Sequence, residues 1–338
     1  MVLVTGGTGL VGSHLILRLV LSKIKVRAIY RSSQKLEEVK KVLSYYQEDV
    51  QSIFDQIEWV KGDILDLPSL EEAFLGIRQV YHAAALISFN PNDFKKLRKV
   101  NAEGTANIVN LCIDHKIDKL CYVSTIGTIG RSQPHKSATE SNEWTEHHSN
   151  VYALTKRSAE MEVWRGTQEN LQVVIVNPGV IIGPGFWNTG SGKLFTTAKK
   201  GYPYYPPGGT GFVSVDDVVQ IMLKLMESSI QNERFILVAE NLSFKTILGM
   251  IAKNLGKNPP KKKLKKWQLE IGRYFDFLKT LITGKPRSIT KNSIYSLFHP
   301  ETYSSDKIRT ALDWEFEPIE NSIAFSSKKF IEEYPAPN

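Results

Sequence analysis

Near its amino terminus the chain reads Thr5-Gly6-Gly7-Thr8-Gly9-Leu10-Val11-Gly12, between a short apolar run at residues 2–5 and a helical pattern at residues 11–22. In such a turn Gly6 allows a tight reversal, Gly9 lets the backbone approach a pyrophosphate, and Gly12 allows the helix to pack closely on the strand. The helix then directs unpaired N–H groups and the positive end of its dipole at the phosphates. The glycine spacing alone is a weak signal, but between a strand and a helix it predicts a dinucleotide-binding turn.

Strand and helix patterns alternate outward from this turn. Apolar runs rich in β-branched and aromatic residues predict strands, and stretches with helical spacing separate them. The predicted strands are residues 2–5, 25–30, 57–60, 79–83, 119–124 and 172–176, and the predicted helices are residues 11–22, 70–75, 95–115 and 152–170. Alternating strands and helices imply parallel pairing with right-handed crossovers. We therefore expect an α/β fold of the Rossmann type, with a doubly wound parallel sheet.

After Pro178 the pattern loosens, and residues 202–211 are rich in glycine, proline and tyrosine. A strand and a helix return at residues 213–228, and residues 234–238 predict one more strand. The length of 338 residues suggests about two domains. We expect a dinucleotide-binding domain at residues 1–180 with a return around 213–240, and a smaller, mainly helical substrate-binding region at 181–212 and 241–338.

The composition favours an ordinary globular protein. Hydrophobic residues make up 42% and charged residues 23%, which excludes disorder, collagen and coiled coil for the whole chain. Two cysteines, Cys112 and Cys121, are too few for a disulfide scaffold or a zinc ribbon, so a reducing, cytoplasmic setting and no metal site are expected. The apolar amino terminus has no basic stretch before it and contains several glycines, so no targeting segment or membrane helix is expected there.

The residues that end the second predicted strand bear on the choice of nucleotide. NAD-selective sites usually place Asp or Glu here to bind the ribose 2′-hydroxyl. Residues 28–33 instead read Ala-Ile-Tyr-Arg-Ser-Ser, and Arg31 can pair with a 2′-phosphate, although a solvent-facing arginine is the plainer alternative. NADP is therefore favoured over NAD, which stays an alternative.

Two further segments lie at predicted strand ends, where doubly wound sheets bind ligands. One is Gly62-Asp63-Ile64, in which Asp63 can accept a hydrogen bond from the adenine amino group or form a turn. The other is His82 followed by Ala83, Ala84 and Ala85, whose small side chains suit close passage of a cofactor.

Tyr152 and Lys156 are four residues apart in a predicted helix, so both project from one face. A phenol with a pKa near ~10 is a weak acid–base catalyst at neutral pH, and a nearby ammonium group is expected to lower that pKa. Tyr152 then donates a proton to a carbonyl oxygen or removes one from an alcohol. A hydroxyl from Ser124 or Thr125, at the end of the preceding strand, is expected to hold the same oxygen.

With these motifs, the sequence resembles the extended short-chain dehydrogenase/reductase family, well over residues 1–240 and more loosely beyond. The resemblance implies that Thr125, Tyr152 and Lys156 are catalytic and that Asn101 orders a proton-relay water, with a helix cap as the alternative for Asn101. The predicted cofactor-binding residues are Gly6, Thr8, Gly9, Leu10, Val11, Gly12, Arg31, Asp63, Ile64, Ala83, Ala84, Ala85, Ser124, Tyr152, Lys156 and Pro178.

Residues 177–184 separate the subfamilies. Sugar-nucleotide epimerases and dehydratases typically carry Arg-Pro-x-Asn-x-x-Gly-Pro. This chain has Asn177-Pro178 followed by Gly183-Pro184, and it lacks both the Arg and the Asn of that pattern. This variant resembles dihydroflavonol reductases, cinnamoyl-CoA reductases and hydroxysteroid dehydrogenases. We expect an NAD(P)-dependent oxidoreductase that reduces a carbonyl, or oxidises the matching alcohol, of a small organic substrate. The alternatives are a nucleotide-sugar epimerase with tightly bound NAD and a non-catalytic dinucleotide-binding protein, while dehydration is disfavoured.

Positive charge is concentrated at residues 251–291, which hold twelve Lys and Arg against two acids. Residues 258–282 have the spacing of an amphipathic helix, closed by Gly284 and Pro286, and we expect its apolar face on the core and its lysines in solvent. Capture of an anionic substrate such as a CoA ester, and contact of residues 261–282 with a membrane surface, are less favoured alternatives. Nucleic-acid binding is not expected, because no recognition motif accompanies the positive charge. A homodimer is an open alternative for the oligomeric state.

Overall fold

The computed structural model describes residues 1–133, 135–147, 149–283 and 291–335. Its main sheet has seven parallel strands in the order β10-β6-β5-β4-β1-β2-β3. These strands are β1 (Val2–Thr5), β2 (Val26–Tyr30), β3 (Ile57–Lys61), β4 (Gln79–His82), β5 (Lys119–Val123), β6 (Val173–Pro178) and β10 (Glu233–Leu237). The order reverses between β1 and β4, which is where doubly wound sheets form a ligand-binding crevice. The predicted Rossmann fold is confirmed.

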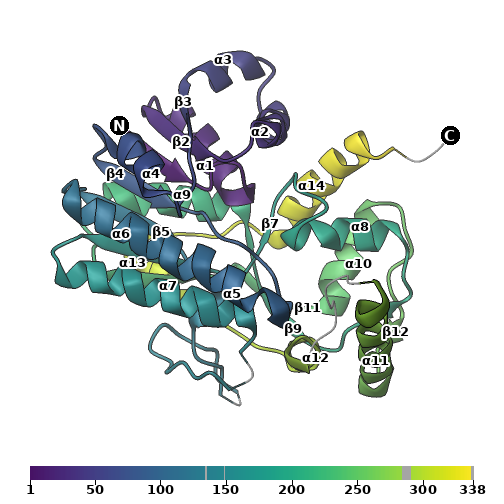
Figure 1. Cartoon of the computed structure of the whole chain (residues 1–338). Helices are drawn as coiled ribbons and strands as arrows, with labels where there is room; N and C mark the ends of the chain where they lie inside the picture. The colour runs from purple at the N-terminus through teal and green to yellow at the C-terminus, as the bar shows by residue number, and fades with distance from the viewer. Residues whose placement is uncertain (134, 148, 284–290, 336–338) are drawn as a thin grey trace.

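Helices cover both faces of this sheet (Figure 1). Alternate strand residues point to opposite faces, so that Val2 and Val4 join one core and Leu3 joins the other. The first core is completed by α1 (Leu10–Leu21), α9 (Val215–Glu227) and α13 (Asp306–Leu312), and the second by α4 (Leu67–Phe74), α6 (Gly104–Asp114) and α7 (Val151–Gln168). Two helices that were not expected, α2 (Gln34–Ser44) and α3 (Val50–Asp55), connect β2 to β3.

The predicted helix at residues 95–115 is not continuous. It consists of α5 (Phe94–Leu97), a π-helical turn η2 (Arg98–Glu103) and then α6. Asn101 lies inside the π-helical turn and is buried, so the alternative that it caps a helix is wrong. A π-helical turn widens the helix by one residue and is often found at functional sites.

A second group of elements lies beside the main sheet, on the right in Figure 1. Its three-stranded sheet has the order β11-β9-β7, formed by β7 (Val180–Ile182), β9 (Gly209–Ser214) and β11 (Glu240–Ser243). The helices α8 (Lys193–Lys199), α10 (Phe244–Asn254) and α14 (Ile319–Glu333) pack on it around Trp187, Phe195 and Phe212. The apolar core of this group is thus separate from the two cores of the main sheet.

The basic segment differs from its prediction. Residues Lys262–Lys263 form β12, which pairs with β8 (Tyr204–Tyr205), and the helix α11 (Lys266–Thr283) begins only after them. Trp267 and Ile271 are 58% and 49% exposed, so the expectation that the apolar face packs on the core is wrong at these two positions. The predicted helix stop at Gly284 and Pro286 lies outside the described residues.

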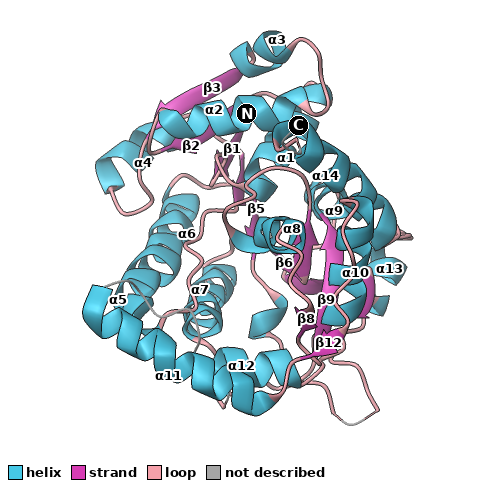
Figure 2. Cartoon of the chain, turned by 90° about the vertical axis from the view of Figure 1, so that its right-hand side faces the viewer, coloured by secondary structure: helices cyan, strands magenta, loops and turns pink. Residues whose placement is uncertain are grey.

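Figures 1 and 2 both place α11 and α12 (Lys291–Phe298) at the end of the molecule opposite β2 and β3. Among the helices that the structure describes, none has the length and apolar character needed to cross a bilayer.

Candidate active site and cofactor-binding crevice

Gly6 and Gly12 of the first turn leave no room for side chains. Gly6 has a φ of +72°, and a Cβ on it would lie 2.5 Å from the Ala84 nitrogen. A Cβ on Gly12 would lie 2.1 Å from the Gly6 carbonyl oxygen. The turn after β1 is therefore pressed between the end of β4 and the first turn of α1, as the glycine spacing predicts.

Gly9 is different, because the chain leaves space beside it. A Cβ here would touch only the Gly6 carbonyl oxygen, at 3.4 Å. Gly9 also caps α1 without a side-chain hydrogen bond, so the N–H groups of the first helical turn remain free for a ligand. An open glycine surface at the start of a 12-residue helix fits the pyrophosphate of a dinucleotide.

Arg31 and Asp63 lie at the neighbouring carboxyl ends of β2 and β3. The Arg31 guanidinium is 67% exposed, and its nearest acidic atom is an Asp63 carboxylate oxygen at 3.8 Å. The other Asp63 oxygen accepts a hydrogen bond from the Leu65 N–H at 3.0 Å, which is the turn role considered for this residue. Within the described residues, the Arg31 side chain makes one loose, solvent-exposed ion pair, which leaves it able to turn toward an anion.

Ile64 and the alanine segment border the same crevice. Ile64 packs so tightly on α6 that a Cβ on Gly104 would lie 2.6 Å from its Cδ1. The Ala83 N–H donates to the Thr5 carbonyl oxygen at 3.1 Å and so continues the ladder of β1 and β4. These contacts place Ile64 against α6 and Ala83 beside the end of β1.

A buried hydrogen-bond chain leads from the glycine turn toward the predicted catalytic residues. Thr105 donates to the Asn101 carbonyl oxygen at 2.5 Å, so His82 Nε2 donates to Thr105 at 2.9 Å. His82 Nδ1 then accepts from the Thr5 hydroxyl at 2.6 Å. Burial, aided by the charge of Lys156, lowers the pKa of His82 to about 3, which keeps the ring neutral as this pattern requires.

Asn101 extends this chain to α7. Its side-chain amide donates to the Leu86 carbonyl oxygen at 3.0 Å and to the Thr155 hydroxyl at 3.1 Å, and its oxygen accepts from the Leu86 N–H at 2.7 Å. Thr155 donates in turn to the Tyr152 carbonyl oxygen at 3.0 Å. Asn101 therefore joins the loop after β4 to the first turn of α7.

Tyr152 and Lys156 occupy this end of α7, which Asn150 caps by accepting from the Ala153 N–H at 2.9 Å. The Lys156 ammonium is buried, donates to the Val123 carbonyl oxygen at 2.7 Å and lies 4.2 Å from the centre of the Tyr122 ring. Tyr152 is half-buried, and its ring meets that of Phe89 edge-on at 5.9 Å between centroids.

The two pKa values correct one expectation. Burial raises the pKa of the Tyr152 phenol well above its usual range, and Lys156 does not offset this. Burial also lowers the pKa of Lys156 to about 7, against an opposing effect of the Glu160 charge. The expectation that Lys156 lowers the pKa of Tyr152 is therefore wrong for the chain alone, because desolvation of the phenol is the larger effect.

Thr125 and Ser124 point to different surroundings. Thr125 has extended backbone dihedrals, and its hydroxyl oxygen accepts from the Gly127 N–H at 3.2 Å at the start of the turn η3 (Ile126–Thr128). Ser124 is buried and donates to a Glu160 carboxylate oxygen at 2.6 Å. The Ser124 hydroxyl is thus directed into the interior under α7, and Thr125 is the hydroxyl left at the site.

Comparison with known proteins identifies the family. The family model described as NAD dependent epimerase/dehydratase family matches residues 2–239. The chain belongs to this family. It is an NAD(P)-dependent enzyme of the extended short-chain dehydrogenase/reductase type, as the motifs predicted.

Individual members of the family are similar over most of the chain. Sterol demethylase protein B of Methylococcus capsulatus is 29% identical over 267 residues, which are 77% of this chain and 76% of that protein. Dihydroflavonol 4-reductase of Gerbera hybrida is 25% identical over 251 residues, which are 70% of this chain and 67% of that protein. The crystal structure of gox2253 superposes with a TM-score of 0.81 and 25% identity, over 100% of this chain and 99% of that one.

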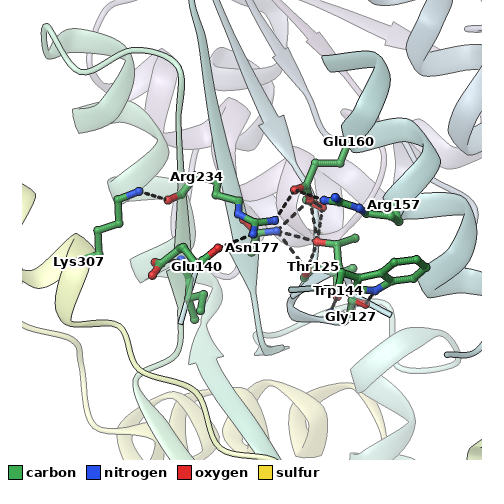
Figure 3. Close-up of polar contacts among 12 residues, drawn as sticks. Thr125, Gly127, Glu140, Trp144, Arg157, Glu160, Asn177, Arg234 and Lys307 are labelled. Atoms are coloured by element: carbon green, nitrogen blue, oxygen red, sulfur yellow. Dashed lines mark hydrogen bonds and ion pairs between the residues drawn. The ribbon is translucent and has the colours of Figure 1, made fainter. Parts of the chain in front are cut away.

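One feature of the epimerase/dehydratase site was not named from the sequence. Glu160 follows Lys156 by one helical turn, and its carboxylate is fully buried among Ser124, Thr128, Asn177 and Arg234 (Figure 3). The spacing Tyr152, Lys156, Glu160 on one helix face was an available signal. The partners of Glu160 come from the end of β5 and from η3, β6 and β10, which no local pattern connects.

Proposed function

We propose that the chain is an NADP-dependent carbonyl reductase that also oxidises the matching alcohol. The observation that carries this proposal is the half-buried Tyr152 on α7, one helical turn before Lys156, whose ammonium binds the Val123 carbonyl oxygen at the carboxyl end of β5. Because burial raises its pKa, Tyr152 is protonated at neutral pH. A protonated phenol is the form that a carbonyl needs as a proton donor when it is reduced.

We place the cofactor at the glycine turn after β1. Gly6, Gly9 and Gly12 border the pyrophosphate position, and Arg31 is free to bind a 2′-phosphate through paired, charge-assisted N–H bonds. The bound nicotinamide supplies or accepts the hydride. NADP is preferred on the strength of Arg31, since no acid follows β2 at residues 31–33.

The chain's own residues then handle the proton and the carbonyl oxygen. Tyr152 delivers the proton from its phenol oxygen, and the Thr125 hydroxyl holds the same carbonyl oxygen. The Lys156 ammonium, fixed by the Val123 carbonyl, supplies positive charge as the phenolate forms. Asn101 keeps the first turn of α7 in place through Thr155.

The substrate we propose is a small carbonyl compound with an apolar body. Ile87, Phe89 and Phe94 are large apolar residues exposed on the segment that precedes and begins α5, and Phe89 contacts Tyr152. Exposed apolar side chains grouped beside a polar catalytic group are typical of a ligand-binding rim. The elements around Trp187 and Phe195 are proposed to complete the substrate region.

The test is consumption of NADPH with a panel of aldehydes, ketones and acyl-CoA esters, run beside the Tyr152→Phe variant. We expect stoichiometric loss of NADPH absorbance with at least one carbonyl class and a turnover at least about 10²-fold lower in the variant. Interconversion of a sugar nucleotide with no net NADPH loss would replace this proposal with an epimerase.

A further inference from the structure

Glu160 is a carboxylate with no solvent exposure, on α7 and close to Thr125 (Figure 3). One of its oxygens accepts hydrogen bonds from Ser124 at 2.6 Å, Thr128 at 2.7 Å and Asn177 at 3.1 Å. The other oxygen lies 3.0 Å from the Arg234 guanidinium. A buried charge is tolerated only when it is paired and fully hydrogen-bonded, and Glu160 meets both conditions.

Two of these partners also hold the backbone of Thr125. The Thr128 hydroxyl oxygen lies 2.8 Å from the Thr125 carbonyl oxygen and 2.7 Å from Glu160, so its single proton is shared between these two acceptors. The Asn177 amide donates to the same Thr125 oxygen at 3.2 Å. Thr128 and Asn177 thus each bridge Thr125 and Glu160 (Figure 3). The carboxylate therefore fixes the turn that presents the Thr125 hydroxyl.

Lys156 contacts the same strand end as Glu160 and its partners. Its ammonium binds the Val123 carbonyl oxygen, so three successive residues, 123 to 125, are tied to α7 or to partners of Glu160. Burial lowers the pKa of Lys156 to about 7, and the Glu160 charge works against this decrease. The other groups facing Lys156 are Tyr122 and neutral His82, while Arg157, at 3.6 Å, and Arg234 face Glu160.

Arg234 connects this arrangement to a distant loop. Its guanidinium donates to the Glu140 carbonyl oxygen as well as to Glu160, and the Glu140 carboxylate accepts from the Ile236 N–H at 2.8 Å. On the same loop, Trp144 donates from its indole nitrogen to the Gly127 carbonyl oxygen at 3.1 Å. The loop at residues 139–145 is thus anchored both to Glu160 and to η3.

We propose that Glu160 is a positioning residue that fixes the Thr125 hydroxyl through Thr128 and Asn177, and that its charge, one helical turn beyond Lys156, favours the ammonium form of that residue. This inference rests on the proposed reductase function for its kinetic test. Glu160 touches no reacting atom, and it acts through the residues that do.

The experiment compares Glu160→Gln with Glu162→Gln, a matched change on the same helix at an exposed residue that pairs with Arg165. Activity that needs charged Lys156 is lost as pH rises through the pKa of that group, and Glu160 raises this pKa. Removing the charge should therefore move the alkaline limb of kcat by about one pH unit or more toward acid. At neutral pH the expected loss is about fivefold or more, with partial recovery at lower pH, whereas Glu162→Gln should match the wild type.

A second variant separates geometry from charge and serves if Glu160→Gln does not fold. Thr128→Val keeps the charge of Glu160 but removes the hydroxyl that joins it to Thr125. We expect a several-fold lower kcat, an unchanged Kd for NADPH and an unmoved alkaline limb. Wild-type kcat in Thr128→Val would overturn the positioning role.

A readout without turnover distinguishes this inference from the proposed function. NMR titration of the Lys156 side chain in the protein without nucleotide, assigned with Lys156→Gln, should give a lower pKa in Glu160→Gln than in wild type. The same pKa in both proteins would overturn the electrostatic role. Failure of the wild type to reduce any carbonyl would instead refute the reductase proposal and leave this titration valid.

Discussion

Arg31 is the residue on which the choice of nucleotide depends. Replacing it with alanine removes a side chain that is 67% exposed and that pairs with Asp63 at 3.8 Å, so the fold should not change. An exposed ion pair of this kind contributes less than about 1 kcal/mol, and releasing Arg31 from Asp63 to bind a phosphate therefore costs little.

The expected effect follows from the bonds that a guanidinium makes with a phosphate. Charge-assisted hydrogen bonds contribute about 1.5–3 kcal/mol, so Arg31→Ala should weaken NADPH binding by about 10- to 100-fold. NADH has no 2′-phosphate, and its affinity should stay nearly unchanged. The selectivity ratio should consequently fall by the same factor as the NADPH affinity.

The assay is a set of fluorescence or calorimetric titrations with both nucleotides. Arg78→Ala is the matched control, because Arg78 is also exposed and ion-paired, with Asp118 at 2.9 Å. Arg78 directly precedes β4, so it lies at the amino-terminal edge of the sheet, opposite the edge at which Arg31 follows β2. An equal loss of NADH and NADPH affinity in Arg31→Ala, or tighter NADH binding by the wild type, would refute the reasoning. Arg31 would then be a surface residue, and NAD would become the preferred cofactor.

Three further predictions concern other parts of the site. Tyr152→Phe should lower turnover by about 10²-fold or more while NADPH still binds, since only the proton donor is lost; near-normal turnover would show that another group donates. Gly12→Ala should lower the unfolding free energy by about 1–3 kcal/mol, because its Cβ would lie 2.1 Å from a backbone oxygen. The melting temperature and the NADPH affinity should both fall, and unchanged values in both measurements would contradict the geometry. His14, whose pKa burial lowers from 6.5 to about 4, is neutral in the native state while the unfolded chain binds a proton below pH 6.5. Unfolding free energy should therefore fall as pH drops from 6.5 to 4, and His14→Gln should reduce that slope by about 1.4 kcal/mol per pH unit; urea titrations with equal slopes would show otherwise.

Features that depend on short sequence distances could be predicted. The glycine turn, the alternation of strands and helices, and the Tyr152 and Lys156 pair each lie within one turn or one strand–helix unit. The alternation of side chains along β5 is a further short-range signal. Tyr122 and Ser124 are two residues apart and so lie on the same face of the sheet, which α7 covers. That pattern indicates that the Ser124 hydroxyl points under α7 rather than toward the cofactor.

Features that depend on tertiary contacts could not be predicted. The Glu160 cluster joins α7 to β5, η3, β6 and β10, so its members are up to 110 positions apart, from Ser124 to Arg234. The raised pKa of Tyr152 results from burial, which no spacing reveals. The late start of α11 follows from the pairing of Lys262–Lys263 with Tyr204–Tyr205, a contact between distant segments that competes with helix formation.

The most direct test of carbonyl reduction uses NADPH with deuterium at the transferable position of its nicotinamide ring and measures whether the deuterium reaches the product. The wild-type enzyme is incubated with an apolar ketone or aldehyde that it consumes, and the product is analysed by mass spectrometry. We expect an alcohol that carries the deuterium at the former carbonyl carbon, formed at least about 10²-fold more slowly by Tyr152→Phe. A product without deuterium, or equal rates for the two proteins, would contradict this expectation.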